Sequence, residues 1–163
     1  MLRLLLLSLI LFLVNGTLIA DPLDNYWQQE VDYEMSITLY DSVRQITGNS
    51  VIKYTNQSPD SLDRIYMHLY PNAFQIGSVK YREYLGNAGR GYRAKYFKEK
   101  LDGFMSKVEI HDMSVALPDK EASWIHKIPI LKEYEIDDTI LEARLNKKIA
   151  PGEMVRIDLN WTH

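Results

Sequence analysis

The sequence of 163 residues contains no cysteine. Disulfides, a cysteine nucleophile and lipid attachment through an N-terminal cysteine are therefore all excluded. A chain without disulfides has to be held together by its apolar core. We expect either a well-packed domain or one part of a larger protein that supplies further packing.

The sequence also lacks an apolar run long enough to cross a bilayer comfortably. Leu4–Val14 is the N-terminal apolar stretch, and a spanning helix needs about 20 apolar residues. It follows Arg3 and precedes the small residue Ala20, which is the order of a secretory signal peptide. We predict that residues 1–20 are a signal peptide, with a cut after Gly16 and an uncleaved anchor as alternatives. The mature protein is then exported, to the periplasm or the extracellular space, and has no membrane segment.

Motifs for common catalytic and metal-binding sites are absent. No two of the four histidines lie three or four residues apart, so no helix can present a pair of them to a metal. The patterns H-E-x-x-H, G-x-S-x-G, G-x-G-x-x-G and the P-loop do not occur. A net charge of −3 gives no reason to expect nucleic acid as a partner. We assign no catalytic, cofactor-binding or metal-binding residue in this chain.

Two weaker candidates have simpler interpretations. Glu135, Asp137 and Asp138 could attract calcium, but too few oxygen ligands are spaced to surround an ion, and a solvated acidic loop is the simpler interpretation. His111 and Asp112 are neighbours in a predicted strand, where successive side chains point to opposite faces. Neither candidate predicts a site.

Alternation of apolar and polar residues is the dominant pattern of the mature chain. It is typical of antiparallel strands and recurs in segments separated by the turn signals Pro59, Pro118 and Pro151-Gly152: 31–39, 46–56, 62–70, 104–117, 139–145 and 154–161. About seven short strands with few helix signals predict an all-β fold, either an antiparallel β-sandwich or a saddle-like pair of sheets. The first two strands are expected to pair, and Gly48 within the second predicts a bulge or a close neighbour.

The third predicted strand, 62–70, is apolar on both of its faces. Ile65 and Met67 alternate with Tyr66 and His68, and Pro71 ends the strand because proline lacks a backbone donor. This pattern predicts a strand covered on both sides. His68 then packs on the second face, while metal ligation is the alternative.

Residues 75–102 interrupt the alternation and predict a partly helical insertion. Short helices are expected at 78–85 and 92–101, joined by the flexible segment GNAGRG. Lysines and arginines outnumber acidic residues there and alternate with tyrosines. The insertion is either a binding surface for phosphate, glycan or an acidic partner, or a segment that is solvated or packs against the protein's own acidic surface.

The order of these motifs resembles a known family. The segments that carry the likeness are Tyr33–Leu39, Ile46–Ser58, Leu62–Ala73 with its HLYPNA sequence, and Glu135–Trp161 with its Pro-Gly turn. They are similar to the N-terminal domain of zinc metallopeptidases related to aminopeptidase N and leukotriene hydrolase, most closely to exported bacterial members. The likeness covers nearly all of the mature chain apart from 75–102 and 121–134.

The resemblance implies that residues 21–163 are the non-catalytic N-terminal β domain of an exported zinc metallopeptidase, truncated at its C-terminal end. Zinc is then expected in the missing catalytic domain, on H-E-x-x-H and a distant glutamate. The expected partners are that catalytic domain and, in the full-length protein, a peptide substrate. Alternatives are a stand-alone secreted β-sandwich module that binds glycan or protein, and an immunoglobulin-like adhesion domain. A domain that normally packs on a catalytic partner should expose an apolar patch when alone.

Overall fold

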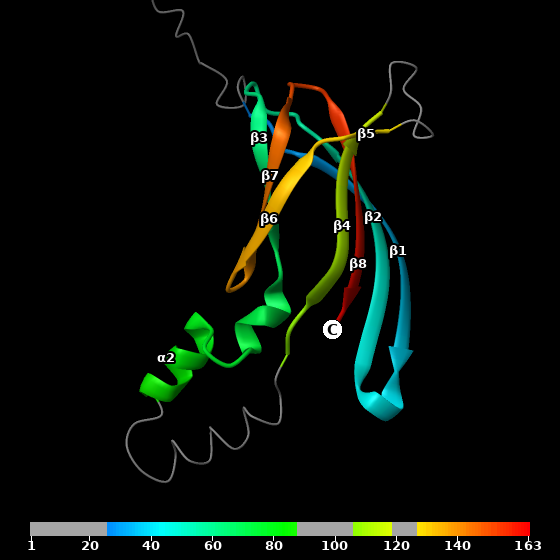
Figure 1. The fold of residues 1–163 in the computed structure, drawn as a ribbon. Helices are drawn as coiled ribbons and strands as arrows, with labels where there is room; N and C mark the ends of the chain where they lie inside the picture. Colours follow the sequence, from blue (N-terminus) through cyan, green and yellow to red (C-terminus); the bar gives the residue numbers. More distant parts are fainter. Residues whose placement is uncertain (1–25, 88–105, 119–126) are drawn as a thin grey trace, which may run out of the picture.

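The computed structural model describes residues 26–87, 106–118 and 127–163. Within them, eight strands form two antiparallel sheets, which confirms the predicted all-β sandwich-like fold (Figure 1). The five-stranded sheet has the order β1 (Glu30–Tyr40), β2 (Gln45–Thr55), β8 (Met154–Thr162), β4 (Glu109–Leu117) and β5 (Ile128–Pro129). The three-stranded sheet has the order β3 (Leu62–His68), β7 (Ile140–Ile149) and β6 (Leu131–Asp137).

Helical segments occupy the connections. A 3-10 turn, η1 (Asp41–Val43), joins β1 to β2, and η2 (Tyr70–Phe74) follows β3 where Pro71 was expected to end it. The predicted first helix of the insertion is confirmed as α2 (Val79–Asn87). The predicted second helix, at 92–101, and the glycine-rich segment before it lie outside the described residues.

The β1–β2 hairpin is regular along its whole length. Its register runs without a shift from Glu30 opposite Thr55 to Tyr40 opposite Gln45. A Cβ atom on Gly48 would lie 2.3 Å from Cζ2 of Trp161, because the indole rests on the glycine backbone. Of the two reasons considered for Gly48, the close neighbour is therefore the correct one.

The core lies where the two sheets face each other, and we call this part of the sandwich the closed end. Inward-facing aliphatic side chains from both sheets are almost completely excluded from solvent there. The largest of them are Leu117, Ile130, Leu141, Ile149, Val155 and Ile157. Apart from Ile130, they belong to β4, β7 and β8, whose buried inward residues are apolar.

Asn56 connects four segments at the closed end. Its fully buried side chain donates from Nδ2 to the carbonyls of Asp60, at 2.7 Å, and Ile149, at 3.0 Å. Its Oδ1 accepts from the hydroxyl of Ser58 at 2.7 Å, and its carbonyl accepts from the N–H of Gly152 at 2.6 Å. Asn56 and Ser58, at the end of the family-like segment Ile46–Ser58, thus have a structural role.

Asn72, in the HLYPNA segment, performs a similar task where η2 meets the β6–β7 turn. Its side chain is fully buried and accepts from the Val108 N–H at 2.7 Å. Its Nδ2 donates to the carbonyl of Asp138 at 3.2 Å, in the left-handed turn between β6 and β7. One asparagine therefore connects η2 to both the β6–β7 turn and the segment directly before β4.

Two predictions about strands are wrong. β3 is an edge strand of the three-stranded sheet, and its second face is exposed at Tyr66 and His68, so the described residues cover only one of its faces. Glu135 and Asp137 lie in β6, not in an acidic loop. Their polar side chains lie on the outer face, where charge costs little, and Ile136 between them faces Leu141 of β7.

Candidate functional site

The two sheets diverge away from the closed end and leave a groove of about 550 Å³ between them. The five-stranded sheet contributes Tyr33, Ile52 and Leu159 from its inner face, and β3 contributes Ile65 and Met67 from the opposite side.

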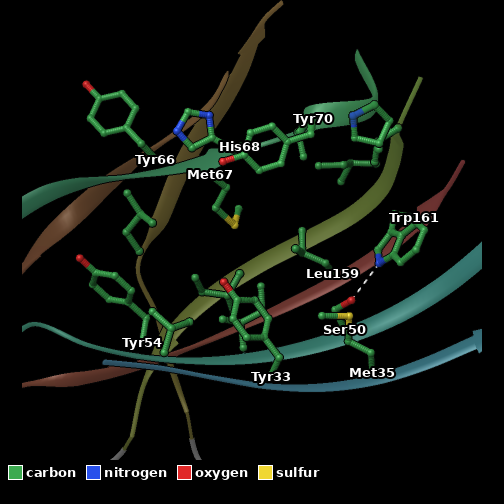
Figure 2. A pocket seen from close by; sticks show the side chains of 18 of the residues that line it. Tyr33, Met35, Ser50, Tyr54, Tyr66, Met67, His68, Tyr70, Leu159 and Trp161 are labelled. Atoms are coloured by element: carbon green, nitrogen blue, oxygen red, sulfur yellow. Dashed lines mark hydrogen bonds between the residues drawn. The ribbon is translucent and has the colours of Figure 1, made fainter. Parts of the chain in front are cut away.

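 Met67 points from β3 toward Tyr33 and Leu159 (Figure 2). The volume lies within the range of about 300–1,000 Å³ that is usual for ligand sites.

The groove is lined almost entirely by apolar and aromatic side chains. Its buried polar group, the Ser50 hydroxyl, accepts a hydrogen bond from Nε1 of Trp161 at 2.8 Å. Burial raises the pKa of Tyr54, so this phenol stays neutral well above physiological pH. Among the described residues, no carboxylate, lysine or arginine lines the groove. Its lining therefore suits an uncharged, apolar surface.

The apolar surface continues beyond the groove along β1. Met35, Ile37 and Leu39 share the inner face with Tyr33, yet they are 50%, 55% and 67% exposed. The hairpin extends past the three-stranded sheet, so no described element covers these side chains (Figure 1). We call the groove and these four side chains of β1 the open face. A continuous apolar surface of this kind marks an interaction site more often than a solvated surface.

Aromatic residues border the open face on the β3 side. The rings of His68 and Tyr70 stack with their centroids 5.2 Å apart and their planes 10° from parallel. Tyr66 and Tyr70 are 56% and 72% exposed, and Figure 2 shows Tyr66 on the side of β3 that points away from the groove. His68 therefore belongs to an exposed aromatic edge and not to a second packed layer.

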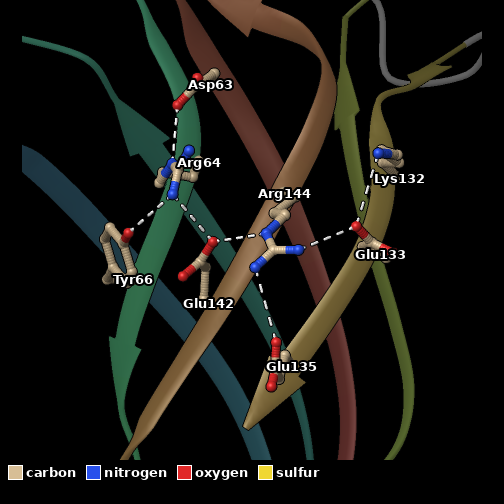
Figure 3. A network of polar contacts seen from close by, with 8 residues as sticks. All are labelled: Asp63, Arg64, Tyr66, Lys132, Glu133, Glu135, Glu142 and Arg144. Carbon is tan, nitrogen blue, oxygen red and sulfur yellow. Dashed lines mark hydrogen bonds and ion pairs between the residues drawn. The ribbon is translucent and has the colours of Figure 1, made fainter. Parts of the chain in front are cut away.

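The outer face of the three-stranded sheet carries a network of ion pairs (Figure 3). Arg144 donates from Nε to Glu142 at 2.8 Å and from a terminal nitrogen to Glu133 at 3.3 Å, while Arg64 reaches the same oxygen of Glu142 at 3.2 Å. The hydrogen bond from Arg144 lowers the pKa of Glu142. Since these groups are solvated, the network contributes little to stability and keeps this face polar.

The outer face of the five-stranded sheet is polar as well. Asp158 pairs with Lys127 at 2.8 Å and with Arg156 at 2.7 Å. Burial raises the pKa of Asp158, but the hydrogen bonds from Arg156 and Lys127 outweigh burial and lower it overall. Both outer faces thus have the character of solvated surfaces, and the open face is the exception.

Of the acidic residues that were considered for calcium binding, Glu135 and Asp137 share the outer face of β6, and Asp138 lies apart from them. Glu135 lies opposite Glu142 on the outer face, whereas Asp138 accepts a hydrogen bond from the Val79 N–H in the turn beyond β6. His68 has a ring partner and not a ligand partner. In the parts of the chain that the structure describes, no three acidic, histidine or cysteine side chains are grouped to hold a metal ion. His126 lies outside those parts.

The open face is the feature that reasoning from the sequence did not locate. Its signal was present in 31–39, where five apolar residues alternate, but alternation identifies a face and not what covers it. The basic and aromatic insertion was the other candidate surface, and most of it lies outside the described residues.

None of the described helices is long and apolar enough to span a membrane. The chain matches no protein-family model, and a search of curated proteins gave no match either.

Proposed function

We propose that residues 21–163 form the non-catalytic N-terminal domain of an exported zinc metallopeptidase of the aminopeptidase N type. In this proposal the open face binds the catalytic domain of the same polypeptide, and the zinc ligands lie in that second domain. The observation that carries the proposal is the row of exposed apolar side chains on β1, combined with the family-like order of motifs.

The chemistry of the open face fits packing and not catalysis. Its groove offers apolar side chains, tyrosines, the engaged Ser50 hydroxyl and two histidines, His68 and His163. Among the described residues, these histidines are not part of a group of three side chains that could hold a metal ion. An apolar ridge of a neighbouring domain would displace water from these side chains at a gain of about 25 cal/mol per Å². The domain would thereby stabilise the catalytic domain and form one wall of a peptide-binding cleft, while zinc bound elsewhere would polarise the scissile carbonyl.

A stand-alone secreted binding module for glycan or protein is the second candidate. The exposed tyrosines beside the groove favour it, since tyrosine supplies a large apolar ring with a polar tip and is enriched at binding surfaces. This candidate requires no second domain. It differs from the first in what the open face contacts.

The test uses the polypeptide translated from the complete reading frame. The proposal expects a downstream H-E-x-x-H motif and peptide hydrolysis that a zinc chelator abolishes. Ile37→Glu, on the open face, should reduce that hydrolysis strongly, while Asn49→Glu, on the polar outer face of β2, should leave it unchanged. A stop codon directly after His163 would contradict the first candidate and favour the second.

A further inference from the structure

β1 is a long edge strand of the five-stranded sheet. It has 11 residues, pairs with β2 on one side only, and contains neither proline nor a bulge. Figure 1 shows no other described element beside its outer edge. An edge of this length presents a row of unpaired backbone groups, which is a template for pairing with another strand.

The register identifies which backbone groups are unpaired. Ile46 and His163 exchange both of their backbone hydrogen bonds at 2.7 Å, so Ile46 directs its N–H and carbonyl toward β8. Directions alternate along an antiparallel strand, and Gln45, opposite Tyr40, therefore points toward β1. The same alternation directs the even-numbered residues of β1 toward β2. The free groups belong to the odd-numbered residues: Val31, Tyr33, Met35, Ile37 and Leu39.

Charge is distributed unevenly along this edge. The outer-face side chains of β1 are acidic in its first half, at Glu30, Asp32 and Glu34, and neutral in its second half, at Ser36 and Thr38. Two such strands that run antiparallel place the acidic half of one against the neutral half of the other. Like charges directly opposite each other, which destabilise a strand pair, are then avoided.

We propose that two copies of this chain associate through β1, in an antiparallel pair whose two-fold axis passes through Met35. Met35 then faces Met35 of the second copy, and every free N–H and carbonyl on β1 finds a partner. Glu34 lies opposite Ser36, and Asp32 lies opposite Thr38. Moving the axis by one residue toward the N-terminus would place Glu34 opposite Glu34, so this arrangement combines full pairing with the separation of charge.

A second copy is the occupant that the edge itself favours. The contact is isologous, since the same strand serves both partners. It joins the two five-stranded sheets into one, and the inner apolar rows of both copies become continuous. The inference goes beyond the proposed function and does not depend on it, because pairing at the β1 edge leaves the open face uncovered.

Distances between spin labels test the arrangement directly. The chain has no native cysteine, so Asp32→Cys and Thr38→Cys each introduce a single labelling site. Both residues lie three positions from the axis, and each label pair should be separated by about 20 Å at about 3.4 Å per residue. An axis displaced by one residue would make the two distances differ by about 14 Å. Unequal distances, or no label pair within range, would overturn the proposal.

Substitutions at one exposed site give an independent test by sedimentation over a wide range of protein concentration. Thr38→Lys places a cation opposite Asp32 of the second copy and should strengthen the dimer roughly three- to tenfold. Thr38→Glu should weaken it by a similar factor. The same two substitutions at Asn49, Asn49→Lys and Asn49→Glu, lie on the same face but away from the edge. They should change the affinity of the dimer by less than about twofold.

A chain that remains a monomer at all concentrations would overturn the proposal. The free edge of β1 would then be available only to a strand from another source. Equal effects of lysine and glutamate at residue 38 would overturn the register.

Discussion

The closed end and the open face are built from the same kind of strand, yet their side chains lie in opposite surroundings. Leu141 and Ile157 at the closed end are 0% and 1% exposed, whereas Ile37 and Leu39 on the open face are 55% and 67% exposed. All four occupy inward positions of alternating strands. The difference is the opposite sheet, which is present over the first pair and absent over the second.

This comparison shows what an alternating pattern specifies. Alternation decides which side chains share a face of a sheet. It does not decide whether a second layer covers that face, because the cover depends on how far a distant segment extends. An uncovered apolar face has a cost in exposed surface, and we attribute its presence here to a partner.

Truncation of one leucine at the closed end and one on the open face should give the largest difference in the free energy of unfolding. Leu141→Ala removes a fully buried side chain and leaves a cavity, so we expect a loss of about 2–5 kcal/mol in the free energy of unfolding. Leu39→Ala should change it by less than about 0.5 kcal/mol, since that side chain is already in water. Denaturant unfolding of the isolated chain measures both values. Equal losses would mean that the open face is packed in solution.

Asn56 should contribute more to stability than an asparagine on the solvated surface. Asn56→Ala removes the hydrogen bonds to the carbonyls of Asp60 and Ile149 and those from the hydroxyl and N–H of Ser58, at a cost of about 2–4 kcal/mol. Asn160→Ala removes one exposed bond to Asn49 and should cost less than about 0.5 kcal/mol. The same unfolding assay compares them, and a small loss for Asn56→Ala would contradict its connecting role.

Gly48 and Trp161 are the main packed pair beside the open face. Gly48→Ala places a methyl group 2.3 Å from the indole, which has to move, and we expect a loss of about 1–3 kcal/mol. The displaced indole should also leave the Ser50 hydroxyl, seen as a shift in tryptophan fluorescence. With Trp161→Ala as background, the further loss caused by Gly48→Ala should nearly disappear. An undiminished loss would show that the cost arises from the backbone.

The ion pairs on the outer face of the three-stranded sheet should have the smallest effect on stability, and this effect should be visible only at acidic pH. The hydrogen bond from Arg144 lowers the pKa of Glu142 in the folded protein. The folded state then binds the proton less tightly than the unfolded chain, so this contribution is present above the ordinary glutamate pKa and is lost as pH falls through the lowered value. Arg144→Gln should raise the pKa of Glu142 toward its ordinary value, which an NMR titration measures. An unchanged pKa would show that the pair is not formed in solution.

Much of the fold could be predicted from the sequence because its signals are local. The alternation in β1, β2, β7 and β8 and the Pro151-Gly152 turn identify strands and turns directly. The helix at Val79–Asn87 was predicted as well. These features depend on residues close in the chain.

The rest depends on contacts between distant segments. β6 was missed because its polar residues on the outer face made EYEID look like an acidic loop. The surroundings of His68 were predicted wrongly because an edge strand and a central strand can carry the same residues. The open face follows from the different extents of the two sheets, which no local pattern contains. The zinc metallopeptidase assignment stays a prediction.

The most direct test of the central claim measures whether the open face is covered in the complete polypeptide. Ile37→Cys introduces one thiol on that face, in a chain that has no cysteine of its own. Its alkylation is followed by mass spectrometry in the 163-residue chain and in the product of the full reading frame. We predict rapid modification in the isolated chain and strong protection in the complete polypeptide, with Asn49→Cys modified rapidly in both. Equal modification of residue 37 in the two forms would contradict the account.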